Sequence, residues 1–431
     1  MPRQLNIRKW TAKELPPDWF KRTRTIDGSI ESDVTVIISA VRKNGDAALV
    51  MFTEKYDKVK VKPENLRVTQ EEIKAAYSKV TETQIQALEL MREKVASFER
   101  GNLKQLGTAT LRDGVIIQTM FSSIQSVGCY VPGGQATYPS TVVMTTVPAK
   151  TAGVPRLVVC SPPDRDGDIN PLVLVACDIC GVNEIYRIGG VQAIAALAYG
   201  TETIKPVCKI VGPGSKYVTM AKVLVSKDVA IDMPAGPSEV LVLGDKTAEA
   251  RFVASDMVSQ AEHGADSVVG LITTSKKIAD EVADWLTNLV VSAERSEIIQ
   301  KAIEAHGFII ICASVDEMVE LANTFAPEHL EILARNPLAI AGKITSAGLI
   351  LVGPYSPVAL SDYGSGTNHV LPTGGFACAF SGLSALDFAR RTNVVDCSRD
   401  ELLALRNHVR IMTEAEKLPN HRRAVEVRFE R

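Results

Sequence analysis

Histidine side chains are the groups in this 431-residue chain best suited to proton transfer or metal binding near neutral pH. The sequence has only six of them, so the residues beside each one are informative. Four of them lie near side chains that could share such chemistry, namely His263, His329, His369 and His421. We take their surroundings in turn, because a histidine by itself predicts neither a ligand nor a base.

The first candidate pair is Gln260 and His263, in the segment SQAEHGADS. A helix is predicted over residues 247–263, and residues three apart share one face of a helix. Gly264 is expected to end that helix, so both side chains would lie at the end of an element. An imidazole nitrogen and an amide oxygen can both bind zinc. The alternative is a helix-terminal histidine that interacts only with the helix dipole.

The second pair is Glu328 and His329, in FAPEHLEI. Pro327 predicts the first turn of a short helix here. An acid beside an imidazole suits proton transfer, because the histidine can take a proton and the glutamate can activate water. The alternative is a surface helix start without a role.

Asp362 and His369 lie in LSDYGSGTNHVLPTGG, a glycine-rich loop after a predicted buried strand. Loops that follow the strands of α/β proteins often bind ligands. We therefore expect Asp362 to offer an oxygen ligand to a metal and His369 to contact a substrate. Glu416 and His421 lie in an amphipathic C-terminal segment, where the local sequence favours plain solvent exposure.

Short apolar runs that alternate with helical segments begin near residue 125. Because each run is apolar throughout and most end in Gly or Pro, they predict strands buried on both faces of parallel sheets, an α/β fold. The runs form two groups, before and after about residue 238, which predicts two α/β sub-domains with a cleft between them. The runs are SVGCYVP, RLVVCSP, EIYRIGG, CKIVGPG, EVLVLGD, SVVGLIT, GFIIICA and GLILVGP, and helices are expected over 191–199, 214–226, 247–263 and 314–325.

The two ends of the chain are predicted to be helical. Thr69 and Glu72 form a capping box before a long stretch without Pro or Gly, and Ser398 and Glu401 form another. Residues 384–431 are expected to form a helical tail.

Nucleotide binding has only weak local signals. No GxGxxG fingerprint is present, although three glycine turns could present backbone N–H groups to a pyrophosphate. Each of them could equally be an ordinary turn between a strand and a helix. These turns are Gly133-Gly134, Gly189-Gly190 and Gly212-Pro213-Gly214.

Composition bounds the class of protein. The formal charge is −2, with 46% hydrophobic and 23% charged residues, which favours neither nucleic acid nor an anionic membrane as partner. No apolar run is long enough for a membrane helix, and the first residues do not form a secretory signal, so the cytoplasm is expected. The eight cysteines are then expected to be reduced, and Cys177 and Cys180 to belong to a packed helix.

Taken together and in order, these segments resemble the histidinol dehydrogenase family. The resemblance runs from about residue 125 to the C-terminus, and the N-terminal part is similar in length and character. It implies two incomplete Rossmann-like units and terminal pieces exchanged in a homodimer. The implied division is an N-terminal segment 1–27, a first α/β domain 28–130 and 239–383, a nucleotide-binding domain 131–238 and a tail 384–431. The matching stretches are VGCYVPGG, RIGGVQAIAALAYGT, VGPGSKYV, DMPAGPSEVLV, SQAEHGADS, FAPEHLEI, DYGSGTNHVLPTGG and EAEKLPNHRRAV.

The resemblance also implies roles for single residues. One zinc ion would be bound by Gln260, His263, Asp362 and, from the partner subunit, His421. Glu328 and His329 would be the acid–base pair, with Ser238, His369 and Glu416 as further substrate contacts. NAD would be contacted by Tyr130, Gln192 and Ser215.

This sequence departs from the family pattern at two places. Ser215 stands where the family usually has Asn. Because serine is shorter and has no amide, one cofactor contact is expected to be lost or mediated by water. Gly264 stands where the family often has an acidic residue.

The implied reaction is the oxidation of L-histidinol to L-histidine through bound histidinal, in two hydride transfers to NAD at the end of histidine biosynthesis. Zinc would orient the substrate, His329 would take protons and Glu328 would activate water. A route through a cysteine thiohemiacetal, with Cys129 or Cys160, is the mechanistic alternative. Oxidation of another alcohol, a zinc hydrolase and a non-catalytic sensor are the alternative functions.

Overall fold

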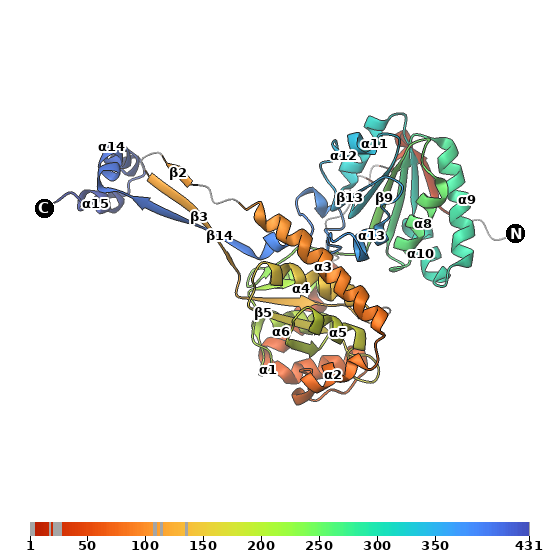
Figure 1. Ribbon diagram of the computed structural model, residues 1–431, viewed down its shortest axis with the longest axis horizontal. Helices are drawn as coiled ribbons and strands as arrows, with labels where there is room; N and C mark the ends of the chain where they lie inside the picture. Colours follow the sequence, from red (N-terminus) through yellow and green to blue (C-terminus); the bar gives the residue numbers. More distant parts are fainter. Residues whose placement is uncertain are drawn as a thin grey trace.

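The computed structural model describes residues 5–16, 19, 28–106, 110–112, 115–133 and 137–430. Two α/β domains lie side by side, and a long arm projects from one of them (Figure 1). Each domain is built on its own parallel sheet, and the arm on a separate antiparallel ribbon. In the part of the chain that is described, no helix is long and apolar enough to span a lipid bilayer.

The first sheet has six parallel strands in the order β1-β11-β10-β9-β12-β13. Two separate apolar cores cover its two faces, because its strands are buried on both sides. One core includes α8, α9, α10 and the start of α13, and the other includes α11 and α12. The strands are β1 (Arg8–Thr11), β9 (Glu239–Gly244), β10 (Val268–Thr273), β11 (Phe308–Ile311), β12 (His329–Leu333) and β13 (Leu349–Val352), and the helices are α8 (Ala250–Ala261), α9 (Lys276–Ser292), α10 (Ser296–His306), α11 (Val315–Phe325), α12 (Pro337–Ala341) and α13 (Val358–Tyr363).

The second sheet has five parallel strands in the order β6-β5-β4-β7-β8. Helices α4 and α5 cover one of its faces, and α6 and α7 cover the other. The strands are β4 (Ser126–Tyr130), β5 (Arg156–Ser161), β6 (Glu184–Arg187), β7 (Lys209–Val211) and β8 (Ala230–Ile231), and the helices are α4 (Pro139–Thr151), α5 (Pro171–Ile179), α6 (Gly190–Tyr199) and α7 (Lys216–Val225).

Three N-terminal helices add an outer layer to this second domain. Helix α1 (Glu31–Asp57) packs on α6 and α7, α2 (Gln70–Tyr77) on α5, and α3 (Glu82–Lys104) on α4. Short 3-10 turns join elements at Ala12–Glu14, Gly28–Ile30, Pro63–Asn65, Phe376–Cys378 and Ala385–Phe388.

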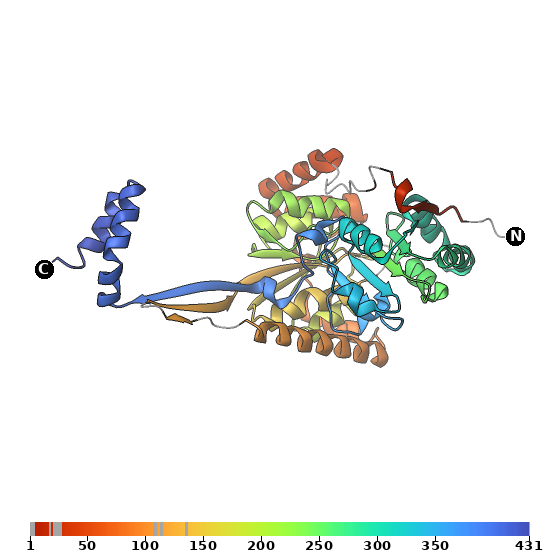
Figure 2. The same cartoon turned by 90° about the horizontal axis from the view of Figure 1, so that it is seen from above.

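The arm extends far from both domains (Figure 2). Its ribbon pairs β3 (Val115–Ser123) with β14 (Ala389–Cys397) and with the short β2 (Thr110–Arg112), all antiparallel. Two helices, α14 (Arg399–Ala415) and α15 (Pro419–Glu426), form its tip. Large apolar side chains stay exposed along the arm, including Val395 at 62% and Met120 at 52%.

The predicted α/β class with two parallel sheets is confirmed, and all eight apolar runs form strands. Both capping boxes are present, at Thr69 before α2 and at Ser398 before α14. The predicted helices over 191–199, 214–226, 247–263 and 314–325 correspond to α6, α7, α8 and α11.

Three local predictions were wrong. Residues 8–11 of the N-terminal segment, predicted to be helical, form the edge strand β1 of the first sheet, because they pair with the backbone of β11. His329 begins strand β12 rather than a helix, because residues of β9 and β13 pair with it on both sides. The tail contains the nine-residue strand β14 before its helices, and that strand is exposed except at its first residue, so its sequence is not apolar.

The domain division expected from the resemblance also differs from the packing. Helices α1, α2 and α3 lie against the helices of the second domain, and β4 is the middle strand of the second sheet. Residues 31–104 and 126–130 therefore belong to the second domain, because that is where their apolar faces are buried. Much of segment 1–27 lies outside the described residues.

Candidate active site

A cleft of about 340 Å³ lies between the two domains and gathers most of the predicted functional side chains. Its volume is in the range of small-molecule sites. The second domain contributes Pro132, Pro213 and Ser215 among others, and the first domain contributes the groups suited to chemistry. These are Ser238, Gln260, His263, Glu328, His329, Asp362 and His369.

The two sheets present opposite edges to the cleft. The second domain contributes loops that follow β4 and β7, at the carboxyl edge of its sheet. The first domain contributes Ser238 and Glu328, which come directly before β9 and β12, at the amino edge. The chain returns to this edge through α8 and α13, so the ends of these helices carry Gln260 and Asp362 into the cleft.

This placement corrects the expectation that the loop after residues 349–352 forms a site at the carboxyl end of its strand. Helix α13 follows β13 and runs back, so Asp362 and His369 reach the amino edge. Sequence order identified these residues, but the rule about strand ends predicted the wrong edge of this sheet.

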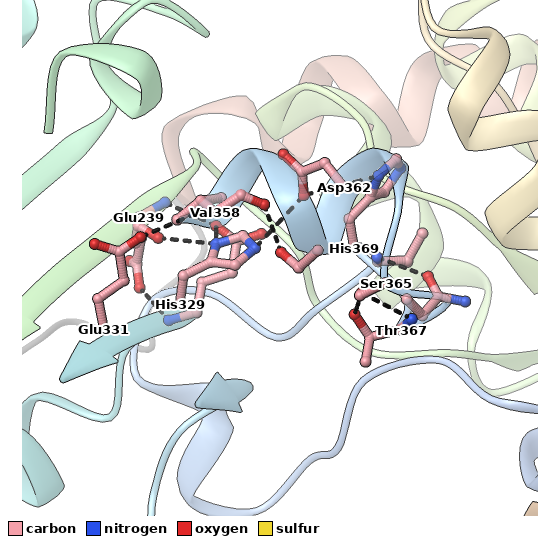
Figure 3. Close-up of polar contacts among 12 residues, drawn as sticks. Glu239, His329, Glu331, Val358, Asp362, Ser365, Thr367 and His369 are labelled. Atoms are coloured by element: carbon pink, nitrogen blue, oxygen red, sulfur yellow. Dashed lines mark hydrogen bonds and ion pairs between the residues drawn. The ribbon is translucent and has the colours of Figure 1, made fainter. Parts of the chain in front are cut away.

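His329 is the centre of the polar contacts in the cleft (Figure 3). Its ring is buried, with Nδ1 3.1 Å from the main-chain oxygen of Glu239 and 3.6 Å from Glu328 Oε2. Its Nε2 lies 3.9 Å from Asp362 Oδ1 and has no hydrogen-bond partner among the described residues. Nε2 is therefore the ring nitrogen left available for a substrate.

The surroundings of His329 set its charge. Burial alone would lower its pKa, but the carboxylates of Glu328 and Asp362 and the Glu239 carbonyl outweigh burial and raise the pKa to about 9. His369 has the opposite balance, since burial and the neighbouring His329 lower its pKa to about 4. At neutral pH, His329 is therefore expected to be an imidazolium and His369 a neutral imidazole.

Glu328 is held by reciprocal bonds with Glu239, the first residue of the neighbouring strand. The Glu239 N–H donates to Glu328 Oε2 at 2.7 Å, and the Glu328 N–H donates to Glu239 Oε2 at 3.3 Å. Glu239 Oε1 also accepts from the Gly374 N–H at 2.9 Å. These bonds fix Glu328 and His329 relative to two strands and to the loop that follows His369.

The donor set in the cleft suits a divalent cation. Asp362 is buried, its Oδ1 has no hydrogen-bond partner among the described residues, and burial raises its pKa to about 6. Burial also lowers the pKa of His263, which keeps its imidazole neutral and able to bind a metal. With Gln260 these side chains offer one amide, one imidazole and one carboxylate. Within the described ranges no three His, Cys, Asp or Glu side chains form a metal-binding cluster, so a complete site needs another donor.

The predicted cofactor residues gather on the second domain. The Gly190 N–H donates to the Tyr130 hydroxyl at 3.1 Å, and Gln192 is buried at the same turn. Ser215 lines the cleft and precedes α7, yet its side chain does not cap that helix. Gly212 has a φ of 119°, and a Cβ there would clash with the main-chain oxygen of Tyr130, so this turn requires glycine. Gly134 lies outside the described residues.

Four predicted residues do not line the cleft, namely Tyr130 and Gln192, which are buried in the second domain, and Glu416 and His421. Glu416 and His421 are exposed at the tip of the arm, which lies far from the cleft of the same chain (Figures 1 and 2). The amphipathic pattern of their segment fits exposed helices, and it does not by itself reveal where their side chains act.

Sequence reasoning missed Glu239 and Glu331, both buried acids in otherwise apolar strands. The signal was a charged residue inside the runs EVLVLG and HLEIL, where a lone buried carboxylate would be costly without partners. All eight cysteines are free thiols, as the sequence predicted. Cys177 is buried in helix α5, and Cys180 directly follows that helix.

Known proteins match the chain over nearly its whole length. The sequence pattern of the histidinol dehydrogenase family covers residues 20–429. A histidinol dehydrogenase of Methanocaldococcus jannaschii is 45% identical over 98% of this chain and 97% of its own length. That of Vibrio cholerae is 45% identical over 94% of each chain.

Structural similarity agrees with the sequence. The crystal structure of histidinol dehydrogenase from Elizabethkingia anophelis superposes with a TM-score of 0.92, at 35% identity and with 99% of both chains covered. Sequence and fold thus indicate the same family over nearly the whole chain. The chain is an oxidoreductase that belongs to the histidinol dehydrogenase family.

Proposed function

We propose that this enzyme oxidises L-histidinol to L-histidine through bound histidinal, with one zinc ion per subunit and two NAD reduced to NADH, as the last step of histidine biosynthesis. The observation that supports this most is the convergence of Glu328, His329, Gln260, His263 and Asp362 in one cleft. Zinc would orient the amine and imidazole nitrogens of the substrate and stabilise negative charge, while NAD would accept each hydride.

His329 moves the protons in this proposal. Because a carbonyl oxygen only accepts, the contact with Glu239 requires a proton on Nδ1 and leaves Nε2 as the exchanging nitrogen. His329 is an imidazolium at neutral pH in the metal-free protein, and a zinc ion bound beside it would lower its pKa, so that a neutral Nε2 would take the hydroxyl proton while a hydride leaves the alcohol carbon. The neighbouring carboxylate of Asp362 stabilises the imidazolium that results.

Glu328 acts in the second half of the reaction. Its Oε2 is held by the Glu239 N–H, so Oε1 is the oxygen left to take a proton from water. As the water adds to the aldehyde carbon, His329 returns its proton to the aldehyde oxygen, which gives a gem-diol. The neutral His329 then takes a proton from one diol hydroxyl as the second hydride leaves. Ser238, His369 and the partner subunit's Glu416 are proposed to bind the substrate, and Tyr130, Gln192 and Ser215 the cofactor.

The arm supports a homodimer with shared sites. Exposed apolar side chains such as Met120, Val395 and Ile411 would be covered if the arm packed on a second copy. The cleft has three proposed zinc donors and needs a further one, and His421 lies at the tip of the arm. We propose that the partner subunit's His421 completes the zinc site. The eight unpaired cysteines fit a reducing compartment such as the cytoplasm.

The decisive experiment is NADH formation by the zinc-loaded protein with L-histidinol, with NADH counted per histidinol consumed. Two NADH per substrate, histidine as product and loss of turnover after zinc removal are expected. If folded protein with bound zinc forms no NADH, the proposal fails and other alcohols, such as small polyols, become the substrates to screen. Hydrolytic turnover without NAD would instead identify a zinc hydrolase.

A further inference from the structure

Glu331 is an acidic side chain buried behind the active site. It follows His329 by two residues on β12 and is only 2% exposed. Alternate residues of a strand share one face, so Glu331 lies on the same face as His329, one layer deeper. Leu333 continues this face in the core that contains α8 and Val358, whereas Leu330 and Ile332 pack in the core of α11.

One oxygen of Glu331 is bonded to helix α13. The N–H of Val358, the first residue of that helix, donates to Glu331 Oε1 at 2.9 Å (Figure 3). Asp362 lies four residues later, one helical turn further, and therefore on the same side of α13. The bond fixes the start of the short helix whose other end carries the proposed carboxylate ligand.

The other oxygen faces helix α8. Glu331 Oε2 is fully buried and no N–H or O–H group of the described residues donates to it, while the Asp256 carboxyl group on α8 lies within hydrogen-bonding reach of the Glu331 carboxyl group. Burial, and then Asp256, hold the pKa of Glu331 well above its usual range, so this carboxyl group keeps its proton. Asp256 precedes Gln260 by one helical turn, the same spacing that separates Val358 from Asp362.

We propose that Glu331 is a positioning residue that joins β12, α8 and α13 and thereby sets the places of His329, Gln260 and Asp362 relative to one another. Its Oε1 accepts from α13, and its protonated Oε2 donates to Asp256 on α8. Groups that orient the side chains around a metal commonly change metal affinity by about 10–100-fold when they are removed. The inference rests on the proposed zinc site, because two of the three positioned side chains are its ligands.

Three variants separate positioning from simple stability. Glu331→Gln keeps an acceptor for the Val358 N–H and can donate to Asp256, so it mimics the protonated acid. Glu331→Leu has similar size but leaves both partners unpaired. Leu286→Ala, on α9 in the same core and far from the cleft residues in sequence, is the control that lowers stability without touching this network.

The measurement is the zinc dissociation constant of the full-length chain, by competition with a chromophoric chelator, beside the unfolding temperature. We expect Glu331→Leu to weaken zinc binding at least tenfold, Glu331→Gln to stay within about threefold of wild type, and Leu286→Ala to lose stability with unchanged zinc affinity. If Glu331→Leu does not fold, Asp256→Ala replaces it, because it breaks only the contact with α8 and should also weaken zinc binding.

Each failure has its own signature. Wild-type protein that binds no zinc would overturn the proposed metal site itself. Tight zinc binding by wild type and equally tight binding by Glu331→Leu or Asp256→Ala would overturn the positioning role alone. A Glu331→Gln variant as weak as Glu331→Leu would show that the shared proton is absent and would reject the proposed hydrogen bond to Asp256.

Discussion

His329 Nδ1 and the main-chain oxygen of Glu239 lie 3.1 Å apart, across the paired strands β12 and β9. Because the acceptor is a backbone carbonyl, this contact does not depend on the ionisation of any side chain. The ring orientation is therefore held through each change in the charge of Glu328 or Asp362. That constancy suits a group that must exchange protons more than once in a turnover.

The pKa of His329 in the metal-free enzyme is expected to be about 9. This is above its ordinary value of 6.5, so protonation of the folded state contributes stability that is full below pH 6.5 and lost as the pH rises to about 9. NMR titration of the ring measures the pKa, and the pH dependence of unfolding measures the linkage. His329→Gln should abolish this window, whereas a ring that titrates at or below pH 6.5 would contradict the assigned contacts.

Asp362→Asn should separate stability from metal binding. The change removes a buried carboxylate whose Oδ1 has no hydrogen-bond partner among the described residues and whose burial outweighs its attraction to His329, so the metal-free variant should unfold at the same or a higher temperature than wild type. Excess zinc should raise the unfolding temperature of wild type and leave that of the variant nearly unchanged. Equal zinc-induced shifts in thermal unfolding scans of the two proteins would remove Asp362 from the ligand set.

Complementation between two inactive chains tests the shared site. A His421→Ala chain retains a complete cleft, and a His263→Ala chain retains a complete arm. Heterodimers of the two should therefore recover one intact site, and about half the activity of wild-type dimers. The comparison needs heterodimers purified with two affinity tags, with the two homodimers as inactive controls. No recovered activity in verified heterodimers would place His421 outside the active site.

Ser215→Asn should strengthen NAD binding. Ser215 lines the cleft before α7 and its side chain makes no capping bond, so a longer amide can reach toward a cofactor without loss to the helix. One added hydrogen bond of about 1 kcal/mol corresponds to about fivefold in affinity. Calorimetric titration with NAD measures the gain, with Ser215→Ala as the control. Unchanged binding in the asparagine variant would show that this position does not contact NAD.

Replacing Cys129 and Cys160 by alanine should leave turnover within a few-fold of wild type. Both thiols are fully buried, and burial raises the pKa of Cys129 to about 12 and that of Cys160 further still. Neither can provide a thiolate near neutral pH. Steady-state rates test this, as does peptide mass spectrometry after iodoacetamide treatment of the folded protein, which should show labelling at the exposed Cys208, Cys378 and Cys397 and none at Cys129 or Cys160. A loss of several orders of magnitude in a folded variant would restore the thiohemiacetal route.

The sequence predicted the two parallel sheets well, because strands buried on both faces are continuous apolar runs. Every continuous apolar run became a strand, and glycines at the ends of the runs marked the turns. Strand β12 was missed because His329 and Glu331 interrupt its apolar pattern. Their polar atoms form hydrogen bonds with Glu239 and Val358, which are distant in sequence, and no local pattern can show such partners.

The sequence predicted which residues gather in the cleft better than it predicted where on the sheet they lie. The order of motifs identified Gln260, Asp362 and His329, whereas the edge of the sheet at which they meet depends on helices α8 and α13 running back along it. The arm was missed for a different reason. Strand β14 is exposed along nearly all of its length, so its sequence lacks the apolar periodicity that would have predicted a strand.

The opposed edges of the two sheets give the cleft an electrical polarity. On the second domain, the helices α6 and α7 begin beside the glycine turns, and the N-terminal end of a helix carries partial positive charge. On the first domain, α8 and α13 end near the cleft, and helix C-terminal ends carry partial negative charge. In the proposed reaction, the wall at the N-terminal ends of these helices would attract the anionic phosphates of a dinucleotide. The other wall would attract a metal cation and the ammonium group of an amino alcohol, so the helix ends would place the two reactants on opposite sides.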